Sequence, residues 1–292
     1  MTTVSTSSVN ATTVSHSTAH ATIEFAVLGS GSSGNATLLR VTEGRARRQI
    51  LIDAGLSPRA VRGQLSALGF DLAETNEVLF THFDSDHARE GWAKVALSTG
   101  LRFRCSAHHL HLARARGYPD IALEPFDASR DGFDLGPVRV KACENPHDDT
   151  GTLAFRLETA AGSIGFATDI GSVTKPLLEL LRGVDLLAIE SNYDPHMQEH
   201  SSRPRFLKDR ITSGRGHLSN AQCIDAVRAI TAADHPEHVV LLHLSRDCNH
   251  PELVERMWAK ELPHLAPKLT IAQPFAPIGP LRMTRPFSAV RV

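Results

Sequence analysis

Short apolar runs separated by polar turns dominate the start of the chain. Residues 23–28, 36–41 and 49–52 are mostly apolar, and each run is bounded by glycine, serine or arginine. Runs of this length and composition are typical of β-strands, and turns this short join antiparallel neighbours. The pattern therefore predicts an antiparallel meander, with the Gly- and Ser-rich segment 29–35 as a tight turn. A nucleotide-binding loop is disfavoured there, because neither GK[ST] nor a GxGxxG followed by a helix is present.

The remaining apolar runs alternate with helical patterns. Residues 57–68 carry apolar side chains at helical spacing, with Ser57 as N-cap and Pro58 in the first turn. A chain of 292 residues can bury a full core, and one α/β domain is favoured over two small ones. Further strands are expected within residues 77–80, 101–106, 138–143, 151–159, 163–171, 184–193 and 238–245.

Four side chains that can bind metals lie just after the predicted strand 77–80. They are His82, Asp84, Asp86 and His87. In extended backbone every second side chain points to the same side, so the first three share one side. Two imidazoles and two carboxylates so close together suit two adjacent cations better than one. A solvated polar loop would seldom combine four ligand-type residues at this spacing.

The segment 82–87 resembles the HxHxDH signature of the metallo-β-lactamase-fold hydrolases, with Asp84 in the position of the second histidine. The resemblance implies further ligands at later strand ends, where this chain has His147, Asp169 and His243. It also implies a four-layer αβ/βα sandwich of two mixed β-sheets, with helices outside and the metals at one edge. Asp53, at the end of the run 49–52, matches a carboxylate that supports the ligand loop from behind the metal ligands.

The same resemblance implies two divalent metal ions, zinc or manganese. The pair would counter the charge of a phosphodiester and activate a bridging water for attack, so Asp86 is a catalytic residue by virtue of metal binding. The carboxylate of Asp84 is a harder donor than an imidazole, which shifts the preference towards Mn²⁺. The expected ligands are His82, Asp84 and His147 for one ion, Asp86, His87 and His243 for the other, and Asp169 as the bridge.

His217 is a candidate for contact with the substrate. It lies where a glycine-containing loop meets a helix start capped by Ser219 or Asn220, and such a position suits an anion. We expect His217 to bind a substrate phosphate or to protonate the leaving group, and Ser219 and Asn220 to contact the substrate. The competing interpretation is an ordinary loop histidine.

A basic stretch precedes this loop. Residues 203–215 hold five arginines and lysines with only Asp209 as an opposing charge, and we expect Arg205 and Arg210 to contact a polynucleotide backbone. A solvated charged face is the simpler alternative. A cluster of histidines also occurs earlier in the chain, but it follows no metal-binding motif, and a solvated helix face is favoured for His108, His109 and His111.

Several short motifs narrow the resemblance further. Segments 28–35, 52–57, 190–194, 216–220 and 243–245 together are similar to the YycJ/WalJ group, over roughly residues 25–253. This likeness implies a DNA-processing exonuclease or phosphodiesterase related to RNase Z and RNase J, with digestion from 5′ to 3′ on nucleic acid, DNA more than RNA. Too few residues separate the later ligands to hold the additional domain that RNase J carries.

Two rival functions remain open at this stage. The first is a metallohydrolase of a small ester, such as a cyclic phosphodiester, a thioester or a lactone, which would share every ligand. The second is a regulator that uses the metals only for structure, and the bridging carboxylate argues against it. A charged track would favour a polymer substrate, and an apolar pocket would favour a small ester.

The composition says more about the cellular compartment of the protein than about the reaction it catalyses. The chain has 31 basic and 32 acidic residues, so any attraction to phosphates must be local. Its 4 widely spaced cysteines indicate reduced thiols and a cytoplasmic protein. Residues 1–22 are rich in serine and threonine, match neither a signal peptide nor a membrane helix, and are expected to form a disordered tail before a hydrolase domain at 23–292.

Overall fold

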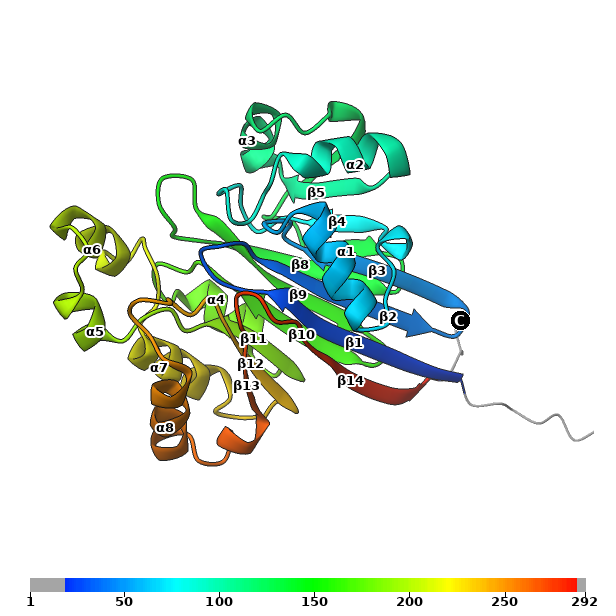
Figure 1. Cartoon of the computed structure of the whole chain (residues 1–292). Helices are drawn as coiled ribbons and strands as arrows, with labels where there is room; N and C mark the ends of the chain where they lie inside the picture. Colours follow the sequence, from blue (N-terminus) through cyan, green and yellow to red (C-terminus); the bar gives the residue numbers. More distant parts are fainter. Residues whose placement is uncertain (1–18, 288–292) are drawn as a thin grey trace, which may run out of the picture.

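Two β-sheets face each other in the computed structural model, which describes residues 19–287 (Figure 1). The first sheet has the order β14-β1-β2-β3-β4-β5-β6 and the second the order β13-β12-β11-β10-β9-β8-β7. The strands of the first sheet are β1 (Ala19–Gly29), β2 (Ala36–Glu43), β3 (Ala46–Ile52), β4 (Glu77–Leu79), β5 (Arg102–Ser106), β6 (Leu123–Phe126) and β14 (Ile278–Phe287). Those of the second are β7 (Phe133–Leu135), β8 (Val138–Asn145), β9 (Thr152–Thr159), β10 (Gly162–Ala167), β11 (Leu186–Glu190), β12 (His238–Leu242) and β13 (Leu269–Ile271).

Helices cover the outer face of each sheet. Apolar side chains between the sheets form the central core. One further apolar cluster lies between the first sheet and its helices, and another between the second sheet and its helices. This arrangement confirms the predicted sandwich of helix, sheet, sheet and helix layers. The helices are α1 (Pro58–Ala67), α2 (Gly91–Thr99), α3 (Leu110–Ala115), α4 (Lys175–Leu181), α5 (Pro195–His200), α6 (Arg205–Thr212), α7 (Asn220–Ile230) and α8 (Pro251–Glu261). Short 3-10 turns span Leu72–Glu74, Ala107–His109, Asp120–Ala122 and Ala266–Lys268.

The predicted meander is confirmed, because β1 pairs antiparallel with β2 and β2 with β3. The prediction of a tail over residues 1–22 is wrong for residues 19–22, which belong to β1. Residues 19–22 form a strand because β14, far away in the chain, pairs with β1 from Ala19 to Val27. The rest of the predicted tail, residues 1–18, lies outside the described residues.

Strand direction brings one edge of both sheets together. Strands β10, β11 and β12 run parallel, and so do β3 and β4, so their carboxyl ends share an edge. Strand β8 has the same direction as β10, because β9 is antiparallel to both. A main-chain hydrogen bond from Leu153 to Thr81 joins the two sheets at this edge. Every predicted ligand follows the end of one of these strands.

Helices α5 and α6 project beyond this edge, and Figure 1 shows them at the left, away from α2 and α3 at the top. A small apolar cluster of Tyr193, Ile211 and Cys248 anchors them. Among the described helices, none has the length and apolar character required of a membrane span.

Candidate metal centre

Strained backbone at strand ends aims several of the predicted side chains. Asp53 follows β3, Asp169 follows β10 and His243 follows β12, and all three have left-handed φ angles of 62°, 52° and 55°. Residues other than glycine rarely adopt this conformation, and it occurs disproportionately at functional sites. The abrupt change of direction turns each side chain from the strand into the space between the sheets' ends.

All seven predicted ligands lie in one cluster, in two groups. The ligand atoms of His82, Asp84 and His147 lie within 4.8 Å of one another, and so do those of Asp86, His87 and His243. Asp84 Oδ2 is 3.9 Å from Nε2 of both histidines of its group. These are the groupings that the resemblance implied.

Asp169 lies between the two groups. Its Oδ2 is 2.9 Å from His87 Nε2, and its Oδ1 is 3.0 Å from His243 Nδ1 and 4.0 Å from His147 Nε2. Both oxygens of the carboxylate therefore contact the second group, and Oδ1 also approaches the first, which leaves Asp169 between the two groups as a bridging ligand would be.

Hydrogen bonds from behind fix the orientation of the rings. Asp53 is buried and accepts from Thr81 N and Thr81 Oγ1, both at 2.8 Å, and from His87 Nδ1 at 2.7 Å. Because the Thr81 hydroxyl donates to Asp53, its oxygen accepts from His82 Nδ1 at 3.0 Å. Nδ1 of both His82 and His87 is thus engaged from behind, which leaves Nε2 as the nitrogen that faces the ligand cluster. Asp53 thus occupies the supporting position predicted for it.

His147 is oriented in the same way by the main chain. Its Nδ1 donates to Gly216 O at 2.9 Å. A side chain at Gly216 would meet Ile211 O at 2.3 Å, so only glycine lets this loop come close enough.

The charges of the cluster act strongly on its histidines. Burial lowers the pKa of His82 well below its usual value, so this ring is neutral and free to bind through Nε2. Burial also opposes the charged form of His87 and His243, but the surrounding carboxylates, Asp169 foremost, together outweigh it and raise the pKa of both rings well above the usual value. The carboxylates therefore create a negative potential that attracts cations.

Unpaired atoms show that the cluster fits divalent metals. Nε2 of His82 and Nε2 of His243 are buried, and within residues 19–287 neither has a hydrogen-bond partner. Each points towards carboxylates of the cluster, since His243 Nε2 is 3.6 Å from Asp86 Oδ2. A buried nitrogen without a partner is costly, and one metal ion in each group would satisfy the nitrogen of that group.

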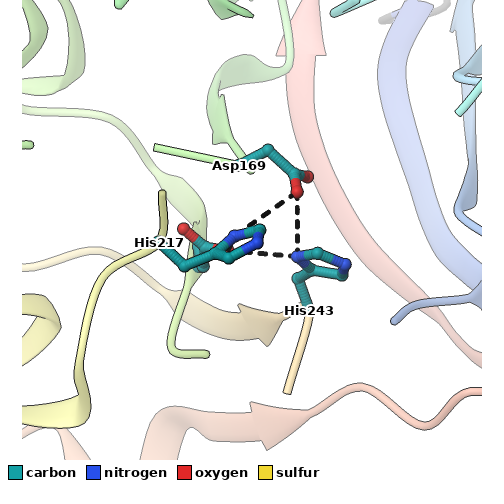
Figure 2. A group of neighbouring side chains, drawn as sticks. Asp169, His217 and His243 are labelled. Atoms are coloured by element: carbon teal, nitrogen blue, oxygen red, sulfur yellow. Dashed lines mark hydrogen bonds and ion pairs between the residues drawn. The ribbon is translucent and has the colours of Figure 1, made fainter. Parts of the chain in front are cut away.

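His217 lies beside this cluster, and Figure 2 shows it next to Asp169 and His243. Its Nδ1 is 2.8 Å from Glu190 Oε1 and 3.5 Å from Asp169 Oδ1. The ring is only partly buried, and in the described chain no partner contacts its Nε2. This nitrogen is available to a substrate.

Ser219 and Asn220, which were predicted to contact the substrate, have their side chains engaged within the protein. Ser219 is 4% exposed and caps α7, with its hydroxyl and main-chain N–H both engaged by Gln222. Asn220 is fully buried, and its amide exchanges two hydrogen bonds of 2.9 Å with Asn249. Both side chains are occupied in holding the loop of His217.

The basic stretch is less free than expected, because each of its arginines has an acidic partner. Arg210 pairs with Asp148, and Arg205 is exposed and pairs with Asp209 and Glu199. The expectation that Asp209 alone opposes these charges is therefore wrong. The remaining pairs are Arg203 with Asp247 and Arg215 with Asp149.

A cavity of about 400 Å³ opens beside the cluster. His217 and His243 line its inner end, and Arg203 and Arg210 line its outer part. Arg205 is not among the lining residues. Of the two arginines predicted to contact a polynucleotide, only Arg210 therefore borders the cavity.

The sequence interpretation missed Glu190, which is completely buried at the end of β11. It contacts His217 and His243, the latter at 3.1 Å, and accepts from the main chain of Ile170 and Leu218. Burial raises the pKa of Glu190, but His217 and His243 together outweigh it, so the pKa is lowered. A carboxylate that ends an apolar strand was a usable signal, of the same kind as at Asp169.

The glycine-rich segment 29–35, predicted only to be a tight turn, also contacts two of the predicted ligands. Asn35 Nδ2 lies 2.9 Å from His87 Nε2, and Ser30 Oγ accepts from His243 N at 2.8 Å. The segment thus packs against both ends of the second ligand group.

Comparisons with known proteins agree with this geometry. A model of the beta-lactamase superfamily domain matches residues 48–244. The chain is 26% identical over 232 residues to the exodeoxyribonuclease YycJ of Bacillus anthracis, spanning 79% of this chain and 86% of that protein. It is 25% identical over 242 residues to the exodeoxyribonuclease WalJ of Streptococcus pneumoniae, spanning 82% and 88%.

The fold is shared more widely than the sequence. The structure of the metallo-beta-lactamase fold protein YhfI from Bacillus subtilis aligns with a TM-score of 0.66 at 16% identity, over 88% of this chain and 98% of that one. Because the family match extends from 48 to 244, more than half of the chain, the protein belongs to the beta-lactamase superfamily and is a hydrolase with the metallo-β-lactamase fold.

Proposed function

We propose that the protein is a metal-dependent exodeoxyribonuclease that hydrolyses DNA from the 5′ end. The observation that carries the proposal is the pair of donor groups joined by Asp169, which opens into cavities lined by arginines. The similarity to YycJ and WalJ, both exodeoxyribonucleases, supports DNA as the substrate. The 5′ polarity rests only on the resemblance to that group.

The ligand residues would hold two divalent cations, zinc or manganese. Such a pair supplies positive charge that stabilises the transition state at phosphorus and makes water acidic enough to react. The buried Asp53 and the Gly216 carbonyl keep His87 and His147 in the tautomer that binds metal through Nε2. His82, Asp84 and His147 form one site, Asp86, His87 and His243 the other, and Asp169 is shared.

His217 is the residue we assign to the leaving group. Glu190 engages its Nδ1, which fixes the ring so that Nε2 faces the cavity. From there Nε2–H can donate a proton to the oxygen that departs when the phosphodiester bond breaks. Loss of this donor should matter most for a poor leaving group, such as the sugar hydroxyl of a nucleotide.

A small ester is the second candidate substrate. The observation in its favour is the apolar part of the 400 Å³ cavity, where Leu207, Ile211 and Leu244 lie. Such a surface suits a compact ligand, whereas the arginines at the outer part suit a phosphate-bearing chain.

A time course on end-labelled oligonucleotides separates the two functions. The protein loaded with Mn²⁺ or Zn²⁺ is given DNA and RNA carrying either a 5′ or a 3′ label, beside a thioester, a lactone and a cyclic phosphodiester. We expect mononucleotides to appear first from the 5′-labelled DNA, and Asp86→Ala to abolish hydrolysis through loss of a metal ligand. Cleavage of the small esters with both polymers intact would overturn the proposal.

A further inference from the structure

A second cavity, of about 370 Å³, lies beside the ligand loop. Asp86 lines it, as do Arg89 and Arg116. Ser32, in the glycine-rich segment, borders both this cavity and the one beside His217. Both cavities therefore border residues of the ligand cluster, and they share one lining residue.

The two arginines of this second cavity differ from those of α6. Within residues 19–287, no carboxylate lies within 4.0 Å of the guanidinium group of Arg89 or of Arg116. By contrast, Arg114 on the neighbouring helix pairs with Asp120, and Arg210 pairs with Asp148. An arginine without an acidic partner keeps its full charge and all its donors for a phosphate.

The main chain around both arginines is held firmly. Arg89 N donates to Ala54 O at 3.0 Å, and Arg89 O accepts from the hydroxyl of Tyr118 at 2.9 Å. Tyr118 is buried against the rings of Phe80 and Phe103, and it follows Arg116 by two residues. One aromatic side chain thus ties the segment of Arg116 to the ligand loop.

Arg89 is also close to the reaction centre. It follows the ligand Asp86 by three residues, so their Cα atoms are at most about 11 Å apart. Glu90 is the carboxylate of this cavity besides Asp86, and it opposes the arginines. The charge of Asp86 would be shared with a bound cation, which leaves the two guanidinium groups dominant.

We propose that Arg89 and Arg116 form a phosphate-binding subsite for the nucleic acid strand, on the α2 and α3 side of the metal centre. The inference rests on the proposed function and names the side from which the strand is held. It assigns phosphate contact to these unpaired arginines rather than to the paired arginines of α6.

Binding of a phosphorothioate oligonucleotide, which resists hydrolysis, to the Mn²⁺-loaded protein tests this subsite. Counterion release at single strands contributes about 0.7 to the salt slope for each phosphate contact. The variant Arg89→Ala with Arg116→Ala should therefore lower the slope of log K against log salt by about 1.4, which corresponds to about 25-fold weaker binding at 0.1 M salt. Glu90→Gln should strengthen binding, because it removes an opposing charge.

Two controls separate the loss of phosphate contacts in the cavity from a general loss of positive charge and from misfolding. Arg114→Ala removes one positive charge from α3 outside the cavity and should keep the wild-type slope. Arg89→Lys with Arg116→Lys should also keep the slope, since counterion release depends on charge. Oligonucleotides with and without a 5′-phosphate tell whether the subsite holds the terminal phosphate or an internal one.

The outcomes distinguish the subsite from the proposed function. If the alanine pair binds with the wild-type affinity and slope, the subsite is refuted even though wild-type protein digests DNA. If binding depends on the two arginines but no DNA is digested, the subsite stands and the exonuclease function fails. Wild-type protein that binds no oligonucleotide at all would overturn both.

Discussion

Replacement of Asp53 by asparagine should weaken metal binding without unfolding the protein. In Asp53→Asn one oxygen can still accept from Thr81, but an amide replaces the oxygen that faces His87 Nδ1 at 2.7 Å. An amide donates there, so the imidazole must move its proton to Nε2, the nitrogen predicted to bind metal. The free energy lost with one charge-assisted hydrogen bond is about 1.5–3 kcal/mol.

This energy translates directly into metal affinity. Loss of a partner that orients a metal-binding histidine typically costs about 10–100-fold in affinity, or about 1.4–2.8 kcal/mol, which agrees with the hydrogen-bond figure. Burial raises the pKa of Asp53, so removing its charge also removes a desolvation cost. We therefore expect the unfolding free energy of the metal-free protein to change much less than the metal affinity.

Competition titrations with a chromogenic chelator measure the affinity for Zn²⁺ and Mn²⁺, and thermal unfolding of the metal-free protein measures stability. Asp71→Asn is the matched control, because Asp71 only caps a short 3-10 turn and asparagine caps equally well. A metal affinity of Asp53→Asn equal to that of the control, with stability strongly reduced, would refute the reasoning and make Asp53 purely structural.

Three further substitutions test other parts of the site. His217→Ala should lower kcat by about 10²–10⁴-fold on oligonucleotides but far less on a nitrophenyl phosphodiester, whose leaving group needs no proton; equal losses on both would exclude a role as acid. Asp84→His should shift the metal content of protein purified without chelators from manganese towards zinc, and an unchanged content would contradict the donor argument. Gly55→Ala should lower the Tm in thermal unfolding, because a Cβ there would lie 1.6 Å from Asp86 O, and overpacking costs about 1–3 kcal/mol or more; a wild-type Tm would show that the loop can move.

Local patterns of apolar residues predicted the central strands well, because each strand is an apolar run that can be recognised by itself. The apolar run that precedes Glu190 in β11 and the bounded runs of β2 and β3 are visible without knowledge of their neighbours. The start of β1 is different, since Ala19 pairs with Phe287 at the opposite end of the chain. No local pattern contains that pairing, so the predicted tail extended into the strand.

The clustering of the predicted ligands follows from their positions after strands whose ends share an edge. The same rule applied to Glu190 would have found the residue that links His217 to His243, but the rule was used only where a family motif pointed. Asn35 was beyond such reasoning. Its contact with His87 joins residues 52 positions apart, and a glycine-rich turn is compatible with any partner.

Charge was the property that the sequence interpretation handled least well. It counted the arginines of the basic stretch 203–215 as free because their acidic partners, such as Asp148 and Asp247, lie 62 and 44 positions away from Arg210 and Arg203. It overlooked Arg89, which lies next to Glu90 in sequence and looks neutralised. The availability of an arginine for phosphate depends on which carboxylates the fold brings within reach, so a charge run alone is weak evidence for a nucleic-acid surface. The same dependence makes the arginines beside Asp86 the stronger candidates, although the sequence gives them no prominence.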